Sequence, residues 1–220
     1  MIIEQLISPI VPVVMPSDTG ARALNLMEAA NITQIPLVAD DKYLALVQEN
    51  DLLDWEATDT PLSAADVLNY RPAVVASGHP YEALRVAHSQ NLSVLPVVDL
   101  DNTYMGSITR EQLLKYVTEN SGLDNPGGII VLEIKAHDYS LAQIARICEA
   151  EETTVISTQL ITNPVTAMLE LTIKTNRTEI GGLANSFERY NYKVKEMYGG
   201  QSSADDMADR YKLLMNYINM

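Results

Sequence analysis

The sequence predicts a mixed α/β and α+β protein built from two pseudo-symmetric β-α-β-β-α repeats, a third unit of β-α-β-β-α-β order and a C-terminal helix. Residues 31–38 (NITQIPLV) return 60 positions later as residues 91–98 (NLSVLPVV), and the match continues past a one-residue insertion. A stretch rich in Gly, Pro and Asn then interrupts every periodic pattern, as at a domain boundary. The expected organisation is a first repeat at 1–60, a second at 61–120, a linker at 121–128, the third unit at 129–198 and a tail helix at 199–220.

Turn residues and apolar spacing predict five elements in the first repeat. Pro36 cannot donate to a strand ladder, so we expect it at the edge of its sheet or at the start of its strand. The elements are a strand at 10–14, a helix from about 19 to Asn31, strands at 35–38 and 43–47, and a closing helix that begins near Glu49.

The second repeat has the same plan. Half of such a fold buries too little apolar surface to be stable alone, so the two repeats should pack on each other. The expected elements are a strand near Val74 and Val75, a helix ending near Gln90, strands at 94–98 and 104–108, and a helix with Leu113, Leu114 and Val117.

In the third unit, Ser140 is expected to cap a helix whose apolar face includes the single cysteine, Cys148. A lone cysteine in line with apolar residues is typical of a core thiol, and it cannot form an internal disulfide. The elements are a strand at 129–134, a helix with Leu141, Ile144, Ala145 and Cys148 on one face, strands at 153–161 and 166–174, a helix with Leu183, Phe187 and Tyr190, and a strand at 192–197.

The formal net charge of −14 is concentrated in the repeats, where residues 1–120 carry 16 acidic and 6 basic side chains. Such a surface repels phosphate backbones and anionic lipids, so we expect binding neither to nucleic acid nor to a membrane. No apolar stretch approaches the length of a membrane span, and the first residues lack the basic start of a signal peptide. These features, with the lone thiol, predict a cytoplasmic protein.

The repeated unit resembles a tandem pair of CBS (cystathionine-β-synthase-type) domains. The resemblance is carried by residues 35–38 (IPLV) and 95–98 (LPVV), and by the closing segments 45–52 (ALVQENDL) and 106–113 (GSITREQL). It implies a binding module, not a catalyst, with clefts for adenosine-containing ligands between the two copies. AMP, ATP and S-adenosylmethionine are the candidate regulatory ligands.

In the family a Ser or Thr, followed three residues later by Asp, opens each closing helix and contacts phosphate and ribose. Here the first copy has Gln48 and Asp51, and the second has Thr109 and Gln112, so neither copy has both parts. Asp51 and Thr109 are the expected anchors, with Gln48, Gln112, Arg71 and Arg110 as secondary contacts. Helix capping or simple surface display is the alternative role for Asp51 and Thr109.

The β-α-β-β-α-β order of the third unit is the ferredoxin-like, split β-α-β plan. Behind a CBS pair it resembles an ACT domain, a small-molecule sensor often specific for amino acids, as in the acetoin-utilisation (AcuB-type) CBS–ACT proteins. The ACT pattern after the first strand is Asp or Asn, any residue, Pro and Gly; residues 137–141 (HDYSL) keep Asp138 but lack the glycine. The resemblance implies effector binding near Asp138 and Ser140, or else a structural role in pairing sheets with a second subunit.

We find no catalytic pattern and no metal-ligand spacing in the sequence. His137 and Asp138 are adjacent, and in an extended segment their side chains would point apart. Met207, Tyr211, Leu214 and Ile218 give the tail an apolar stripe, which either packs on its own unit or reaches a second subunit.

Three hypotheses follow. The leading one is a homodimeric, non-catalytic regulatory protein whose CBS pair senses an adenosyl compound and signals to the ACT-like unit or to a protein partner. The second is a structural adaptor whose clefts have lost their ligands. The third is an amino-acid sensor that acts through Asp138.

Overall fold

The computed structural model describes residues 1–65 and 69–199, so the tail helix expected at 199–220 lies outside the described residues from position 200 onward. The chain forms two compact units, and the boundary between them falls after Val117. Within the described ranges, no helix is both long enough and apolar enough to cross a bilayer. The first unit has two hydrophobic cores, one in each repeat, and the second unit has one.

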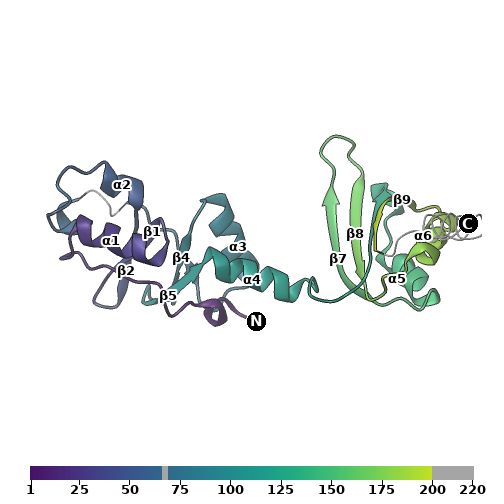
Figure 1. The fold of residues 1–220 in the computed structure, drawn as a ribbon, viewed down its shortest axis with the longest axis horizontal. Helices are drawn as coiled ribbons and strands as arrows, with labels where there is room; N and C mark the ends of the chain where they lie inside the picture. Colours follow the sequence, from purple (N-terminus) through teal and green to yellow (C-terminus); the bar gives the residue numbers. More distant parts are fainter. Residues whose placement is uncertain (66–68, 200–220) are drawn as a thin grey trace, which may run out of the picture. The chain divides into compact units, whose positions relative to one another are not determined.

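The first unit contains both repeats (Figure 1). A short 3-10 turn, Ile3–Leu6, precedes them, and another, Leu62–Ala64, lies between them. The first repeat contains α1 (Gly20–Ala30), β1 (Gln34–Ala39), β2 (Lys42–Gln48) and α2 (Glu49–Leu53). The second contains β3 (Val74–Val75), α3 (Pro80–Ser89), β4 (Val94–Val98), β5 (Tyr104–Thr109) and α4 (Arg110–Asn120).

The expected strand at residues 10–14 is wrong. Only Val14 pairs there, through a single parallel bridge to Leu37, and Ile10 is 80% exposed. The equivalent β3 is also short, with Val74 opposite Val97 and Val75 opposite Val98. Pro12 and Pro36 lack the N–H groups that would extend the parallel pairing, and the second repeat has prolines at the same two places.

Pro36 lies in β1, one strand of the two-stranded sheet β1-β2, but its equivalent in the second repeat lies in a central strand. Pro96 is the third residue of β4, the central strand of the order β3-β4-β5. The sheet tolerates it because the parallel pairing with β3 covers only Val97 and Val98. The proline therefore lies just beyond the end of that ladder.

The two repeats pack on each other, as the sequence predicts. Tyr43 and Leu46 of the first repeat are buried in the core of the second, together with Ile3 and Leu6. In return, Val94 of the second repeat lies in the core of the first.

The second unit is a four-stranded antiparallel sheet of order β7-β8-β6-β9. Two helices lie on one face of this sheet (Figure 1). Its elements follow the strand and helix order that the sequence predicts: β6 (Ile129–Ile134), the 3-10 turn Ala136–Asp138, α5 (Leu141–Ala150), β7 (Val155–Thr162), β8 (Leu169–Thr175), α6 (Gly181–Arg189) and β9 (Lys193–Tyr198).

The buried faces of these helices differ in part from those expected. In α5 the buried residues are Ile144, Ile147 and Cys148, whereas Leu141 is 50% exposed. In α6, Leu183 and Phe187 are buried, but Tyr190 follows the helix and is 56% exposed.

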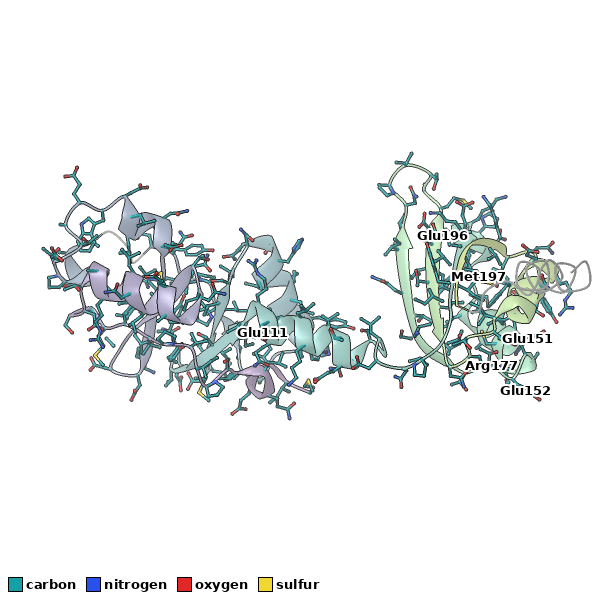
Figure 2. All side chains as sticks on the ribbon, in the orientation of Figure 1. Glu111, Glu151, Glu152, Arg177, Glu196 and Met197 are labelled. Carbon is teal, nitrogen blue, oxygen red and sulfur yellow. The ribbon has the colours of Figure 1, made fainter. Side chains whose placement is uncertain are left out.

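The ends of α5 and α6 are joined by polar contacts around Glu151. Its carboxylate accepts from the Ser186 hydroxyl and lies 3.4 Å from the Arg189 guanidinium, while its carbonyl accepts from Arg177 at 3.3 Å. Figure 2 shows Glu151 and Arg177 at the same end of this unit. These contacts fix the two helices on the sheet.

Candidate functional site

Equivalent residues of the two repeats meet each other, as they do across a pseudo-twofold axis. The Thr33 amide donates to the Ser93 hydroxyl at 3.0 Å, and these residues are 60 positions apart. Lys42 bridges to Thr103, its equivalent after the insertion, and its ammonium group donates to the Thr103 hydroxyl at 3.0 Å. A surface formed on one side of this axis therefore has a counterpart on the other side.

A cavity of about 420 Å³ lies between the two repeats, and we call it the first cleft. Its wall is apolar except at Thr109, which comes from the second repeat. The apolar lining residues are Ile10, Val11, Pro12, Leu26, Ala29, Ala30 and Ile32.

Thr109 reaches this cavity because it ends β5 directly before α4. Its hydroxyl accepts a hydrogen bond from the backbone N–H of Gln112 at 3.2 Å, so Thr109 caps the helix. A helix N-terminus has free N–H groups that favour an anion. The exposed carboxylate of Glu111 also lies in the first turn of α4 (Figure 2), where it opposes a large negative charge on a ligand.

The second cleft is the pseudo-symmetric counterpart of the first. Shifting the lining by 60 positions replaces Ile10 with Tyr70 and Ala30 with Gln90. The Tyr70 hydroxyl donates to the Gln90 side-chain oxygen at 3.0 Å. Burial raises the pKa of Tyr70 above its ordinary value. This agrees with the position of its ring, which packs against the core of the second repeat.

Gln48 and Asp51 come together at the start of α2, where Gln48 corresponds to Thr109. The Gln48 amide donates to the Asp51 carboxylate at 3.4 Å, and Asp51 is exposed. Arg71 follows Tyr70 in the chain and lies near Tyr43. Burial raises the pKa of Tyr43 far above its usual range, and the charge of Arg71 opposes this rise.

Arg110 is directed to the end of α3. Its guanidinium donates to the Leu92 carbonyl at 3.1 Å and to the Asn91 side-chain oxygen at 3.1 Å. Among the six residues predicted for nucleotide contact, the structure thus brings Thr109 and Gln112 to one helix start and Gln48 and Asp51 to the other.

In the second unit, the Ser140 hydroxyl caps α5 by accepting from the Gln143 amide at 3.3 Å. Ser140 also lines a cavity of about 440 Å³ with Arg146 and Tyr190. Asp138 does not line this cavity.

The expectation that His137 and Asp138 point apart is wrong. His137 Nε2 lies 3.4 Å from Asp138 Oδ1, and both side chains are well exposed. The two residues belong to a 3-10 turn, not to an extended segment, and the turn brings their side chains to the same side. Across residues 1–65 and 69–199, no group of three His, Cys, Asp or Glu side chains is arranged to hold a metal ion.

The sequence analysis missed Tyr70, Gln90 and the small residues Ala29 and Ala30. The signal that could have found them was the 60-residue shift itself, applied to the residues that flank the strands as well as to the strands.

Part of this chain is similar in sequence to a larger protein, an enzyme. The chain is 30% identical over 143 residues to inosine-5′-monophosphate dehydrogenase of Methanocaldococcus jannaschii, which covers 63% of this chain. The match spans only 28% of the length of the dehydrogenase.

Part of the chain is similar to three solved structures. A CBS domain pair/ACT domain protein from Thermotoga maritima has a TM-score of 0.48 at 19% identity, covering 54% of this chain and 98% of that one. CBSX2 in complex with AMP has a TM-score of 0.47 at 23% identity, with coverages of 54% and 96%. A putative acetoin utilization protein from Vibrio cholerae has a TM-score of 0.46 at 24% identity, with coverages of 54% and 91%.

The sequence pattern of the CBS domain family matches this chain twice, at residues 3–58 and at residues 64–119. Together these two segments make up half of the chain. These two matched segments contain the two repeats and the residues that line the first cleft. The protein therefore belongs to the CBS domain family and carries a tandem CBS pair.

Proposed function

We propose that this protein is a non-catalytic regulator whose CBS pair senses an adenosine-containing small molecule and signals to the second unit or to a protein partner. The observation that carries the proposal is the first cleft, a largely apolar cavity of about 420 Å³ whose lining includes Thr109 at the start of α4. The single buried thiol accords with a reducing compartment such as the cytoplasm.

The chemistry of the first cleft suits such a ligand. Pockets for small molecules commonly enclose about 300 to 1,000 Å³ and combine apolar walls with a few polar groups. A purine ring is flat and largely apolar on its faces, so it fits between α1 and the segment at residues 10–12. Thr109 and the first amides of α4 then offer hydrogen bonds to a ribose hydroxyl or a phosphate.

The test is the melting temperature of the full chain against AMP, ATP and S-adenosylmethionine. A ligand at 100 times its Kd adds about 2.7 kcal/mol to the free energy of unfolding. We expect stabilisation by at least one adenosyl compound. Replacement of Thr109 by Val should weaken this ligand about tenfold, whereas the control Thr109→Ser keeps the hydroxyl and should retain binding. Silence across the panel would support a structural adaptor instead.

Asp51, next to Gln48 at the start of α2, is the corresponding anchor for a ligand in the second cleft. Its carboxylate can accept from both hydroxyls of a ribose, and it is exposed at the start of α2. Replacement of Asp51 by Ala should weaken a ribose ligand about tenfold without unfolding the chain if the ligand lies on this side. Unchanged affinity would limit the site to Thr109 and its neighbours.

For the second unit we propose an ACT-like domain. The order β-α-β-β-α-β and the sheet order β7-β8-β6-β9 support a ferredoxin-like, split β-α-β plan. An amino-acid effector near Asp138 and Ser140 is the corresponding second function, favoured by the cavity that Ser140 lines with Arg146. Stabilisation by an amino acid, lost in Asp138→Ala but not in Lys135→Ala, would support it.

A further inference from the structure

We propose that the CBS pair takes one adenosyl ligand per chain, in the first cleft, because the Tyr70–Gln90 pair closes the second. This assignment rests on the proposed function and adds to it the choice of cleft. A hydrogen bond of 3.0 Å between Tyr70 and Gln90 joins the segment before β3 to the end of α3, at the two positions equivalent to Ile10 and Ala30 of the first cleft.

The two clefts differ in chemistry at this pair of positions. Their equivalents in the first cleft are Ile10 and Ala30, both of which line the open cavity. Neither side chain can donate or accept a hydrogen bond. Ile10 is also 80% exposed, whereas Tyr70 is partly buried against the core of the second repeat.

Tyr70 is held at both of its ends. Its carbonyl accepts from the Leu46 amide at 2.8 Å, and Leu46 is fully buried. Its ring packs against the core of the second repeat, and its hydroxyl donates a hydrogen bond to the Gln90 side chain. A ligand that entered the second cleft would have to displace an anchored aromatic side chain, whereas the first cleft is already open.

The walls of the two clefts also differ in polarity. Ala29 and Val11 line the first cleft, and the equivalent positions in the second are Ser89 and Arg71. An apolar wall binds the face of a purine without leaving polar groups unpaired, which a polar wall cannot do as well. Both differences favour the first cleft.

The experiment is isothermal titration of the full chain with the adenosyl compound that stabilises it, starting with AMP. We expect one site per chain. The double variant Tyr70→Ile, Gln90→Ala gives the second cleft the residues of the first at these two positions and removes the closing contact, and we expect it to bind two. Replacement of Ala30 by Tyr should fill the first cleft and weaken wild-type binding more than tenfold. Its matched control on the same helix is Glu28→Tyr, at an exposed residue outside the cavity.

Two sites in the wild type, one site in the double variant, or unchanged binding in Ala30→Tyr would each overturn the choice of cleft and leave the proposed function standing. Absence of binding by every adenosyl compound would overturn both. The melting temperature of each variant shows whether it folds; if Ala30→Tyr does not, Ala29→Tyr fills the same cavity from the neighbouring residue.

Discussion

Gly106 shows how a single residue adapts the second repeat to its surroundings. It lies in β5 with a φ of +140°, and an added Cβ would overlap Cγ2 of Ile7. Its equivalent in the first repeat is Ala45, which is fully buried in β2. A glycine is therefore required where the N-terminal segment crosses the strand.

Replacement of Gly106 by Ala should lower the free energy of unfolding by about 1 to 3 kcal/mol, because it adds both backbone strain and a steric overlap. Urea denaturation followed by circular dichroism measures the change. In the Ile7→Ala background the same replacement should cost less, since the overlap is then relieved. Equal costs in the two backgrounds would show that Ile7 does not restrict the position.

Cys148 is a buried thiol with no role in the proposed clefts. Its side chain is 1% exposed on α5, and burial raises its pKa to about 11. We expect a thiol reagent at pH 8 to label the native protein only through opening of the second unit, because the reactive species is the thiolate. Labelling should accelerate steeply with urea. Labelling of the native protein at the rate of a free thiol would contradict the buried position.

Only a small part of the candidate site could be predicted residue by residue. The resemblance to the CBS family predicts Thr109 and Asp51 at the start of the closing helices, and both lie at a helix start. The direction of Arg110 could not be predicted, since its partners at Asn91 and Leu92 are distant in sequence. The Tyr70–Gln90 contact likewise depends on how α3 packs, which no local pattern describes.

At the scale of elements, two helices in the first unit end in the same way. Asn31 after α1 and Asn91 after α3 both adopt the left-handed conformation, each with a φ of 51°. Asn tolerates this conformation better than residues with a larger or branched side chain. Asn91 has an additional contact, because its side-chain oxygen accepts from Arg110 at 3.1 Å.

Replacement of Asn31 by Gly should therefore change the free energy of unfolding little, because Gly adopts the same backbone conformation freely. Replacement of Asn91 by Gly should cost more, by about 0.5 to 1.5 kcal/mol, because it removes a hydrogen-bond acceptor. Denaturation of the two variants in parallel measures the difference. Equal stabilities would show that the Arg110 contact adds nothing.

In the second unit, the strands are linked on the sheet face opposite the helices by Lys195 of β9 and Glu170 of β8. Hydrogen bonds from Asn163 and from Lys195 lower the pKa of Glu170. A carboxyl group whose pKa is lowered on folding stabilises the protein above its unfolded pKa, and this contribution is lost as the pH falls through the folded pKa.

We therefore expect the second unit to lose stability as the pH falls below about 4.3, the ordinary pKa of a glutamate, and through the lower pKa of Glu170 in the folded protein. The variant Glu170→Gln should be less stable than the wild type at pH 7 and should lose less on acidification. Thermal melts from pH 7 to pH 3 compare the two proteins. Parallel curves for wild type and variant would show that Glu170 does not contribute to the pH dependence.

Strand limits were predictable where the local pattern acts alone. The strand Ile129–Ile134 begins and ends where the sequence predicts, because it is a run of five apolar residues, interrupted only by Glu133, that follows two glycines. The strand expected at 10–14 does not form beyond the bridge at Val14. Its partner strand, β1, has Pro36 next to that bridge, and proline has no N–H group with which to extend the pairing. Pairing between distant segments thus decided the outcome.

At the scale of the whole molecule, one helix belongs to both the cleft and the domain boundary. Helix α4 begins directly after Thr109 and ends at Asn120, while the second unit begins at Thr118. A ligand shifts a conformational equilibrium only by the difference in its affinity for the two states. A change at the Thr109 end of α4 has a continuous hydrogen-bonded element through which it can reach residue 118.

Proline at Lys115 tests this route, because it removes one backbone hydrogen bond of α4 and clashes with the preceding turn. In the wild type we expect AMP, or whichever adenosyl compound binds, to slow hydrogen exchange in α1 and α4 and to change it at residues 118–134. In Lys115→Pro the protection of α1 should remain, and the change beyond residue 118 should disappear. The control Lys115→Ala keeps the helix and should behave as the wild type does. If the change beyond residue 118 persists in the proline variant, the signal does not travel along α4; if the wild type shows none, the CBS pair binds its ligand without informing the second unit.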